Sequence, residues 1–400
     1  MGSRLLSTLI VLLLIAALMR GDFALALIYL VVASLAIGFW WSRQSLTQVR
    51  ISRHFNAHAF IGERIHVDLR IRNEGWLPIP WLELHETLPV ALAGPHSFQS
   101  VTQLGPRTDA KFEYSMEALK RGYYPVGPLF ISTGDILGLS DTLLTETNAE
   151  HVVVYPKIIH FTTMDVPSRS PQGTLRYSVP LFEDPTRIFG KRGYVSGDSL
   201  RRIDWKASAA NGRLQVKLFE PSIALETCII LNLNAEDYHY RARIDSTELG
   251  IVIAASISNW IIERKQMVGI TINGRDPLAT DGKPQSLPPR KGKQHLMRIL
   301  ESLARVEIVE SSPLVQLLQT QRYHLTWGTT LIVITGQASV DVINELYQAR
   351  RDGQSAILIL VGRHPEDKVI HQRAKSLGIA LYFITSERDL KIWMQESKHS

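Results

Sequence analysis

The C-terminal half of the chain alternates short apolar runs with longer stretches of helical periodicity. Apolar runs with the length of a buried strand lie at residues 227–233, 267–272, 331–335, 356–361 and 379–384. Stretches with helical spacing lie between and after them, at residues 246–263, 294–305, 340–350, 366–377 and 387–394. Alternation of this kind predicts a parallel sheet with helices on both faces. We therefore expect an α/β domain over residues 222–400, in which residues 276–292 form a polar loop.

Residues 44–158 show the period-two alternation of strands that have one buried face. Alternating stretches lie at residues 47–51, 65–71, 81–85, 111–114 and 129–131. Turns rich in Gly and Pro separate them, and residues 151–155 are either a last strand or a linker. Short strands with this punctuation predict an antiparallel β-sandwich of immunoglobulin-like type.

Two long runs without charge open the chain, and only Arg20-Gly21-Asp22 separates them. The second run, residues 23–41, is long enough to cross ~30 Å of hydrocarbon. We expect a transmembrane hairpin over residues 1–43, with helices at about 4–20 and 23–42. A cleaved signal peptide followed by a single anchor is the alternative interpretation.

Basic residues flank this hairpin. Arg4 precedes the first run and Arg43 follows the second, whereas Arg20 in the short loop is offset by Asp22. Loops rich in Lys and Arg stay on the cytoplasmic side of a membrane. Both termini and the remaining domains are therefore expected in the cytoplasm.

The composition excludes several kinds of site. The single cysteine, Cys228, rules out an intramolecular disulfide and a cysteine-based zinc cluster, and its apolar surroundings predict a buried thiol. The sequence contains no Gly-rich phosphate loop and no His-Glu-x-x-His motif. A pI of about 9.3 is moderately basic and well short of that of a protein that coats nucleic acid, so we expect no nucleic-acid partner.

The positive charge of the chain gathers in residues 186–220. Eight basic residues lie there: Arg187, Lys191, Arg192, Arg201, Arg202, Lys206, Arg213 and Lys217. Three acidic residues, Asp198, Asp204 and Glu220, leave a net charge of +5, compared with +6 for the whole chain. Such a concentration of charge predicts a surface for an acidic partner.

The same stretch carries local structure signals. A turn at residues 197–199 is expected to cap a helix, with Asp198 or Ser199 as the capping residue. The apolar positions of that helix are Leu200, Ile203, Ala207 and Ala210, and Asn211-Gly212 ends it. Residues 214–218 alternate like a strand. We expect Trp205 to pack this segment against a sheet.

The stretch Gly190–Pro221 resembles the signature of a bacterial family known as domain of unknown function 58. The matching positions are Arg192 with Tyr194, Gly197 with Asp198, Arg202-Ile203-Asp204-Trp205, Ser208-Ala209 and Phe219-Glu220. Ala210 stands where the family often has Arg. Arg121-Gly122-Tyr123-Tyr124 and the turn at Asp135-Ile136 resemble the same family, and we expect Arg121 and Asp135 to anchor loops.

This resemblance implies a role rather than a reaction. It implies a scaffold or adaptor, anchored in the bacterial inner membrane, that works alongside MoxR-type AAA ATPases in envelope-related assembly. The partner-binding residues are then Arg192, Tyr194, Gly197, Asp198, Arg201, Arg202, Asp204, Trp205 and Lys206. Residues 159–221 form a linker and this basic signature segment, between the sandwich at 44–158 and the α/β domain at 222–400.

The loop after the first predicted strand of the α/β domain resembles, in degenerate form, the metal site of a von Willebrand factor A-type domain. That fold holds a divalent cation with oxygen ligands at alternate loop positions. Here Asn232, Asn234 and Glu236 occupy the loop, and Thr335 follows a later strand. Asn is a weak ligand without carboxylate neighbours, so we expect a scaffold without a metal; Mg²⁺ binding is the alternative.

Three functions remain open from the sequence. The first is a scaffold without enzymatic activity that binds a protein partner and the lipid bilayer and has no cofactor and no small-molecule substrate. The second is a metal-dependent ligand receptor. The third is an enzyme with Asp198 and Asp204 as acid and base, although capping and pairing with Arg201, Arg202 or Lys206 is the simpler role for these carboxylates.

Overall fold

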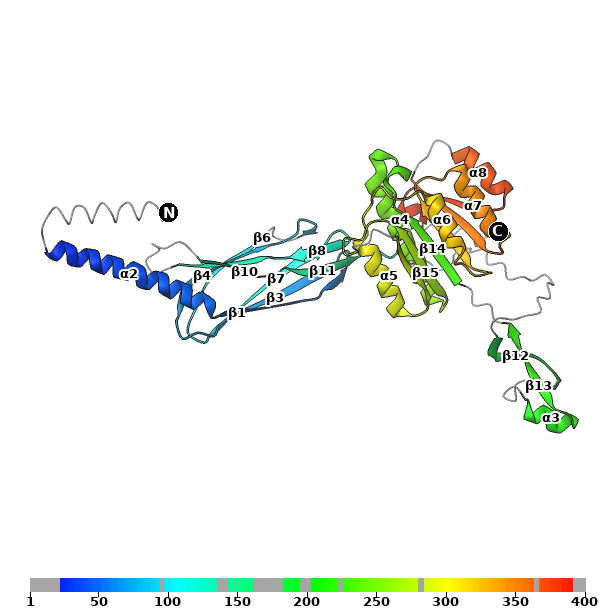
Figure 1. The fold of residues 1–400 in the computed structure, drawn as a ribbon, viewed down its shortest axis with the longest axis horizontal. Helices are drawn as coiled ribbons and strands as arrows, with labels where there is room; N and C mark the ends of the chain where they lie inside the picture. The colour runs from blue at the N-terminus through cyan, green and yellow to red at the C-terminus, as the bar shows by residue number, and fades with distance from the viewer. Residues whose placement is uncertain are drawn as a thin grey trace. The chain divides into compact units, whose positions relative to one another are not determined.

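The computed structural model describes residues 22–93, 97–134, 143–147, 149–160, 183–194, 203–221, 226–279, 284–362 and 367–390. The chain divides into two compact units (Figure 1). The first unit runs to Lys157 and includes Leu300–Val306, and the second contains the rest.

The first helix described is α2, Asp22–Thr47, which contains the predicted helix at 23–42. Its last turns pack on the sandwich, because Leu46 is buried and Trp41 Nε1 donates to the carbonyl of Pro78 at 2.9 Å. The predicted strand at 47–51 therefore starts two residues later. The predicted helix at 4–20 lies outside the described residues. None of the helices within the described residues combines the length and the apolar composition needed to cross a membrane.

Three sheets form the first unit. One sheet has the order β1-β3-β7-β5, with bounds Val49–Phe55, Arg64–Asn73, Asp109–Ala118 and Leu92–Ala93. Another has the order β10-β9-β4-β6, with bounds Leu143–Thr147, Leu129–Thr133, Ile79–Thr87 and Ser97–Leu104. A small sheet joins β2, β11 and β8, with bounds His58–Phe60, Glu150–Tyr155 and Gly122–Val126.

The two four-stranded sheets pack face to face. Strand β3 alternates strictly between exposed and buried residues, as the period-two pattern predicts. Its Leu69 and Ile71 share one buried cluster with Leu82 and Leu84 of β4 and Ile131 of β9. The predicted antiparallel sandwich is therefore present. The Gly122–Tyr124 segment lies in strand β8, where it pairs with β11.

A buried ion pair joins the layers of the sandwich. Arg53 on β1 pairs with Glu86 on β4, and both side chains are almost fully buried. Tyr114 on β7 donates its hydroxyl to Glu86 Oε2 at 2.7 Å, and Arg53 Nη1 donates to the carbonyl of Val126 at 3.4 Å. Burial and the neighbouring Glu86 carboxylate raise the pKa of Tyr114 well above its ordinary value.

Arg121 anchors a helix end within the first unit, in agreement with the loop-anchoring role expected for it. Its Nη1 donates to the carbonyls of Leu303, Ala304 and Val306 at 2.9, 3.1 and 3.0 Å. These carbonyls belong to the segment that ends helix α5, Lys293–Arg305. A cation placed there satisfies carbonyls that the helix leaves unpaired. The other residue expected to anchor a loop, Asp135, lies outside the described residues.

A six-stranded sheet forms the centre of the second unit, in the order β16-β15-β14-β17-β18-β19. The strands, in this order, span Gln285–Arg290, Met267–Asn273, Glu226–Asn232, Thr330–Thr335, Ser355–Val361 and Ala380–Ile384. Five strands are parallel, as predicted, whereas β16 is antiparallel and lies in the segment that we expected to be a loop. The order is that of a doubly wound α/β fold.

The antiparallel edge strand β16 contains Pro288 and Pro289 where its register with β15 shifts. The irregular backbone comes so close to Gly269 of β15 that a Cβ there would lie 2.8 Å from the ring nitrogen of Pro289. Glycine at this position therefore permits the pairing of the two strands. Proline is tolerated in an edge strand because no ladder hydrogen bond is required on the outer side.

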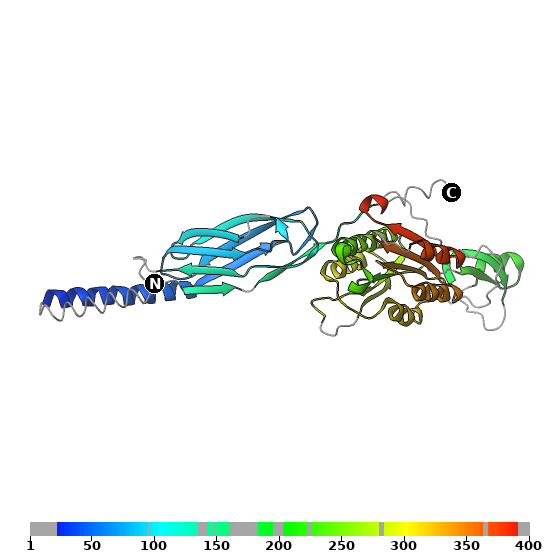
Figure 2. The ribbon, with the colours of Figure 1, turned by 90° about the horizontal axis from the view of Figure 1, so that it is seen from above.

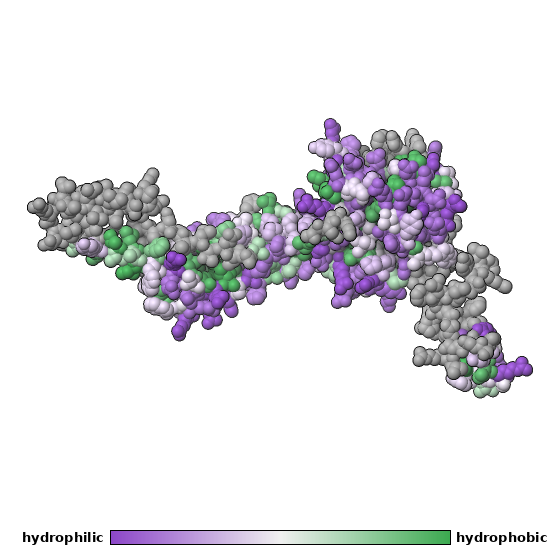
Figure 3. Space-filling model, in the orientation of Figure 1, coloured by the Kyte–Doolittle hydropathy of each residue, from purple (hydrophilic) through white to green (hydrophobic). Residues whose placement is uncertain are grey.

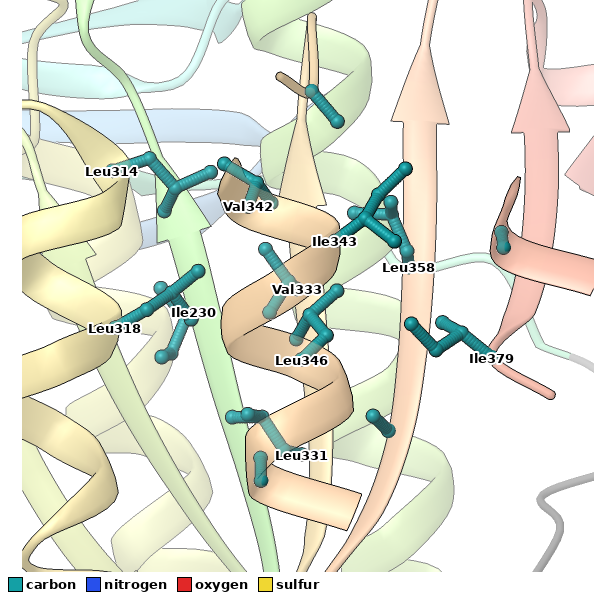
Figure 4. Close-up of a cluster of buried hydrophobic side chains, with 14 of the residues drawn as sticks. Ile230, Leu314, Leu318, Leu331, Val333, Val342, Ile343, Leu346, Leu358 and Ile379 are labelled. Atoms are coloured by element: carbon teal, nitrogen blue, oxygen red, sulfur yellow. The ribbon is translucent and has the colours of Figure 1, made fainter. Parts of the chain in front are cut away.

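Helices cover both faces of this sheet (Figure 2). On one face lie α6 (Leu314–Arg322), α7 (Val340–Arg351) and α8 (Asp367–Ser376), and α4 (Arg243–Glu263) covers the other. Figure 4 shows Val342, Ile343 and Leu346 of α7 packed between Leu318 of α6 and the sheet residues Val333 and Leu358. The thiol of Cys228 is buried in this cluster, as expected, and burial raises its pKa to about 12.

Candidate functional site

The basic signature segment forms a small module of two strands and one helix. Strand β12, Glu183–Gly193, pairs antiparallel with β13, Gln215–Pro221, and α3, Trp205–Asn211, lies between them in the sequence. Strand β13 was predicted, but β12 was not. Two register shifts in β12, between Asp184 and Ile188 and between Ile188 and Gly190, break the period-two pattern by which a strand is found.

Asp204 organises the start of α3. Its Oδ1 accepts a hydrogen bond from the amide of Ala207 at 3.1 Å, which makes it the N-cap, and its Oδ2 lies 2.8 Å from Lys191 Nζ. These contacts lower the pKa of the Asp204 carboxyl, with the Lys191 contact as the largest cause. Capping and pairing were expected, but Lys191 on β12 is the cation, rather than Arg201, Arg202 or Lys206.

A continuous set of hydrogen bonds ties the helix to the strand that follows it. The amide of Asp204 donates to the carbonyl of Gln215 at 2.8 Å, and the amide of Gln215 donates to Ser208 Oγ at 2.8 Å. Ser208 Oγ in turn donates to the carbonyl of Asp204 at 2.7 Å. Gly212, with φ +63°, ends the helix in the left-handed conformation that was predicted for Asn211-Gly212.

Two expectations about this segment are wrong. Ile203 forms a β-bridge with Val216 and does not belong to the helix, which begins at Trp205. Trp205 does not pack against a sheet, because 67% of its surface is exposed. The apolar positions that close the module are Ile203 and Val216, which are both buried. In a helix of seven residues, helical spacing alone does not show which side chain faces inward.

Of the nine predicted partner-binding residues, five lie within the described residues and four do not. Arg192 on β12 and Lys206 on α3 are exposed, and the amide of Tyr194 donates to the carbonyl of Leu214 at 2.9 Å. Asp204 and Trp205 start the helix. The other four predicted residues lie outside the described residues: Gly197, Asp198, Arg201 and Arg202.

The described surface of the module combines cations with exposed apolar side chains. Figure 3 shows hydrophilic and hydrophobic surface side by side on this module. Lys206 and Arg213 are exposed, and so are Trp205 and Leu214. A hydrogen bond joins the backbone of Asp204 to that of Gln215. Trp205 follows Asp204 and Leu214 precedes Gln215, so this bond brings Trp205 and Leu214 to one end of the module. Exposed Trp together with Arg is the composition of a binding hot spot.

A second polar cluster lies at the carboxyl edge of the six-stranded sheet, where strands β14, β15 and β17 end in Asn232, Asn273 and Thr335. Asn232 is fully buried. Its Oδ1 accepts from the amide of Asn234 at 3.2 Å and from Asn273 Nδ2 at 3.1 Å. Its Nδ2 donates to Asp237 Oδ2 at 2.7 Å and to Thr335 Oγ1 at 3.0 Å. The side chain of Asn232 therefore uses both donors and both lone pairs within the protein.

The neighbouring loops close over this amide. Asn234 Nδ2 donates to Asp237 Oδ2 at 3.3 Å, and Tyr238 donates its hydroxyl to the carbonyl of Asn232 at 2.6 Å. Burial raises the pKa of Tyr238, with the Asp237 charge as a further cause. Gly336 permits the contact, since a Cβ there would lie 2.4 Å from the carbonyl oxygen of Asp237.

Three of the four degenerate metal positions meet in this network: Asn232, Asn234 and Thr335. Glu236 does not join them; it is exposed, and the adjacent Asp237 supplies the carboxylate. The alternation of the A-type motif predicted Glu236 in place of Asp237, and Asn273 was not among the predicted positions. Hydrogen-bonded amides hold the loops in place, and the described residues contain no cluster of three or more His, Cys, Asp or Glu side chains suited to a metal.

Part of this chain, including the signature segment, matches a family model. Residues 190–352 match the model of the family described as "Protein of unknown function DUF58". The chain is 22% identical over 290 residues to the "Uncharacterized protein YeaD" of Bacillus subtilis, a match that covers 71% of this chain and 69% of that protein.

Solved structures with some likeness include the von Willebrand factor type A protein from Catenulispora acidiphila. It is 12% identical, the match covers 46% of this chain and 43% of that one, and the TM-score is 0.31. The SpRpn10 VWA domain is 14% identical, with 44% of this chain and 95% of that one covered and a TM-score of 0.27. Residues 190–352, which contain the predicted signature residues, therefore match the DUF58 family model, and the chain is similar to one distant relative.

Proposed function

We propose that this chain is a membrane-attached scaffold without catalytic activity, and that the β12–α3–β13 module binds an acidic surface of a partner protein. The contrast between two adjacent residues carries the proposal. Asp204 is held by a backbone amide and by Lys191, whereas Trp205 leaves 67% of its surface exposed. A large aromatic side chain on a fixed short helix adds little to folding and much to an interface.

The charge of the module supports an acidic partner. Lys206 and Arg213 are exposed beside Trp205 and Leu214, and neither cation belongs to an ion pair among the described residues. Cations at the rim of an interface speed association with an acidic surface and disfavour basic partners. The expected partner surface is therefore an apolar pocket with carboxylates around it.

The state of Asp204 supports a role in structure rather than in catalysis. Its pKa is lowered, so the carboxyl is ionised near neutral pH and carries no proton that it could donate as a general acid. Both of its oxygens are also engaged, by Ala207 and by Lys191. These contacts support the scaffold over an enzyme that uses Asp204.

The partner and the membrane attachment are proposed on separate grounds. A MoxR-type AAA ATPase is the candidate partner because of the family resemblance, with envelope-related assembly at the bacterial inner membrane as the setting. Exposed apolar side chains on α2 support attachment to a lipid bilayer, among them Tyr29, Leu30, Ile37, Phe39 and Trp40.

The test is binding of the full chain to a purified MoxR-type AAA ATPase, measured by biolayer interferometry. Trp205→Ala is expected to weaken binding by about 30-fold or more, because an aromatic hot spot contributes roughly 2 kcal/mol or more. The charge reversal R201E/R202E/K206E is expected to abolish binding. Tyr323→Ala serves as the matched control, since Tyr323 is also an exposed aromatic residue but lies outside the module. Binding of both module variants at wild-type strength would remove the proposal.

A further inference from the structure

A second group of cations lies at the amino end of strand β15, far from the signature segment in the sequence. Arg264 and Lys265 immediately precede β15, and Arg290 ends β16, which pairs with it. Lys291 and Lys293 follow Arg290 at the start of α5. Because Arg290 lies opposite Val268, both loops leave the same end of the strand pair. All five side chains are exposed, and we call them the β15–β16 basic patch.

The negative charges closest to this patch along the sheet have other partners. Glu263 accepts a hydrogen bond from Asn259 at 2.9 Å and lies 3.8 Å from His160. Glu226, at the start of the neighbouring strand β14, accepts from Thr326 Oγ1 at 3.3 Å. Lys265, Arg290, Lys291 and Lys293 form no ion pair within the described part of the chain, and these four cations therefore face solvent with two carboxylates nearby.

Stability of the fold does not account for three of these cations. Lys265 has φ +59°, a conformation that costs a residue with a side chain free energy and that Gly or Asn would adopt more easily. Lys291 precedes α5 and Lys293 is its first residue, and the first turn of α5 contains no acidic residue. The amino end of a helix favours acidic side chains and disfavours Lys and Arg. Arg264 differs, because it ends α4 at the carboxyl end, where a cation is favourable. Lys265, Lys291 and Lys293 thus occupy positions that weaken the fold, as residues selected for binding often do.

We propose that the β15–β16 basic patch binds an anionic phospholipid surface. Arg264 is the one cation of the patch whose guanidinium lies over an aromatic ring, that of Trp260 at 3.8 Å. The patch is rich in Lys and has no exposed Trp, Tyr or Phe within it, whereas the cores of protein interfaces are enriched in aromatic residues and depleted of Lys. Clusters of four to eight Lys and Arg residues are typical of binding to anionic headgroups, with no apolar anchor needed.

The test uses the full chain mixed with vesicles of phosphatidylcholine alone or of phosphatidylcholine with about one-third phosphatidylglycerol. The measurement is amide hydrogen exchange over residues 264–266 and 290–296. Protection is expected only with the phosphatidylglycerol vesicles and is expected to disappear at about 0.5 M NaCl, since salt screens exposed charges. In K291Q/K293Q, the lipid concentration for half-maximal protection should rise by about 25-fold, because each cation contributes roughly a five-fold gain in affinity.

Two controls separate this inference from the proposed function. K206E/R213E removes cations of the module and should leave the lipid-dependent protection unchanged. K291Q/K293Q should bind the MoxR-type ATPase as the wild type does, and its unchanged circular dichroism would show that it is folded. Equal protection by both kinds of vesicle, or unchanged protection in K291Q/K293Q, would overturn the inference. Protection by the ATPase in place of the vesicles would assign the patch to a protein instead.

Discussion

The two units bury polar side chains in different ways. The sandwich encloses a charged pair, Arg53 with Glu86, and the α/β unit encloses neutral amides, Asn232 and Asn273. A buried ion pair that loses one partner leaves an uncompensated charge, which costs several kcal/mol. A buried amide that loses a partner costs only an unmade hydrogen bond. The comparison teaches that losing one polar partner should destabilise the centre of the sandwich more than the edge of the α/β sheet.

Breaking the charged pair should have the largest effect. Glu86→Gln keeps the shape of the side chain but leaves the buried Arg53 with only the partly exposed carboxylate of Glu150, which lies 3.7 Å from its Nη1. The variant should lower the free energy of unfolding by about 3–5 kcal/mol. Urea denaturation, monitored through the hydrogen exchange of peptides from β3 and β4, measures the stability of this unit alone. The double variant R53M/E86L should recover most of the loss, since apolar residues replace a buried pair well.

The matched control for this variant is Glu74→Gln, which breaks the exposed pair between Arg50 and Glu74. Exposed pairs contribute ~0–1 kcal/mol, so this control should unfold almost as the wild type does. A Glu86→Gln protein as stable as the wild type would show that breaking the buried pair costs little free energy. The proposed difference between the sandwich and the α/β unit would then be wrong.

A charge placed in the neutral network should have the next largest effect. Asn232→Asp removes two donated hydrogen bonds and places a carboxylate where Nδ2 lies 2.7 Å from Asp237 Oδ2. The loss near neutral pH should be about 2–3 kcal/mol, from unpaired buried groups and like-charge repulsion. Two adjacent carboxylates raise each other's pKa, so the penalty exists above the raised pKa and shrinks as the pH falls through it.

Thermal unfolding at about pH 7 and about pH 4.5 measures this dependence, with Asn344→Asp as the control. Asn344 Oδ1 already accepts from Arg373 Nη2, so a carboxylate there gains a cation instead of a carboxylate neighbour. A deficit of Asn232→Asp that grew as the pH fell would contradict the like-charge explanation.

The smallest effect is expected at Asp204, on the surface module. Its pKa is lowered in the folded state, so its contribution to stability is complete above the ordinary value of 3.8 and is lost as the pH falls through the lowered value. The protection factors of the amides of Ala207 and Ser208, which compare the exchange rate with that of an unfolded peptide at the same pH, should fall on acidification in the wild type. The neutral amide of the Asp204→Asn variant can still cap the helix, so its protection factors should be slightly lower at neutral pH and should depend little on pH. Wild-type protection factors that stayed constant down to about pH 3 would show that the carboxylate contributes nothing.

Much of the fold could be predicted because the buried elements have regular patterns. The apolar run at 227–233 became β14, Glu226–Asn232, and the stretch at 340–350 became α7, Val340–Arg351. Elements with irregular patterns could not be predicted in this way. Strand β16 was missed because prolines are atypical of a strand, and β12 was missed because its register shifts break the period-two pattern. Helix α6 was missed because it spans only nine residues.

The candidate site was less predictable, because it depends on contacts between distant parts of the chain. The sequence placed the cap of the helix at Asp198 or Ser199, whereas Asp204 caps α3, because the helix begins only at Trp205. Lys191 was missed as the partner of Asp204 because it is distant along the chain. Asp237 was missed because the alternating motif selected its neighbour Glu236. The exposure of Trp205 could not be read from spacing, since Ile203 and Val216 close the module through a β-bridge instead of a helical face.

Pro288 and Pro289 have a consequence for how molecules of this protein can assemble. They lie in the outermost strand of the six-stranded sheet and carry no amide hydrogen at two successive positions. An approaching strand from another molecule would find no amide donor at these two positions, which disfavours extension of the sheet on that side. The prolines therefore act against fibrillar growth at this edge of the sheet.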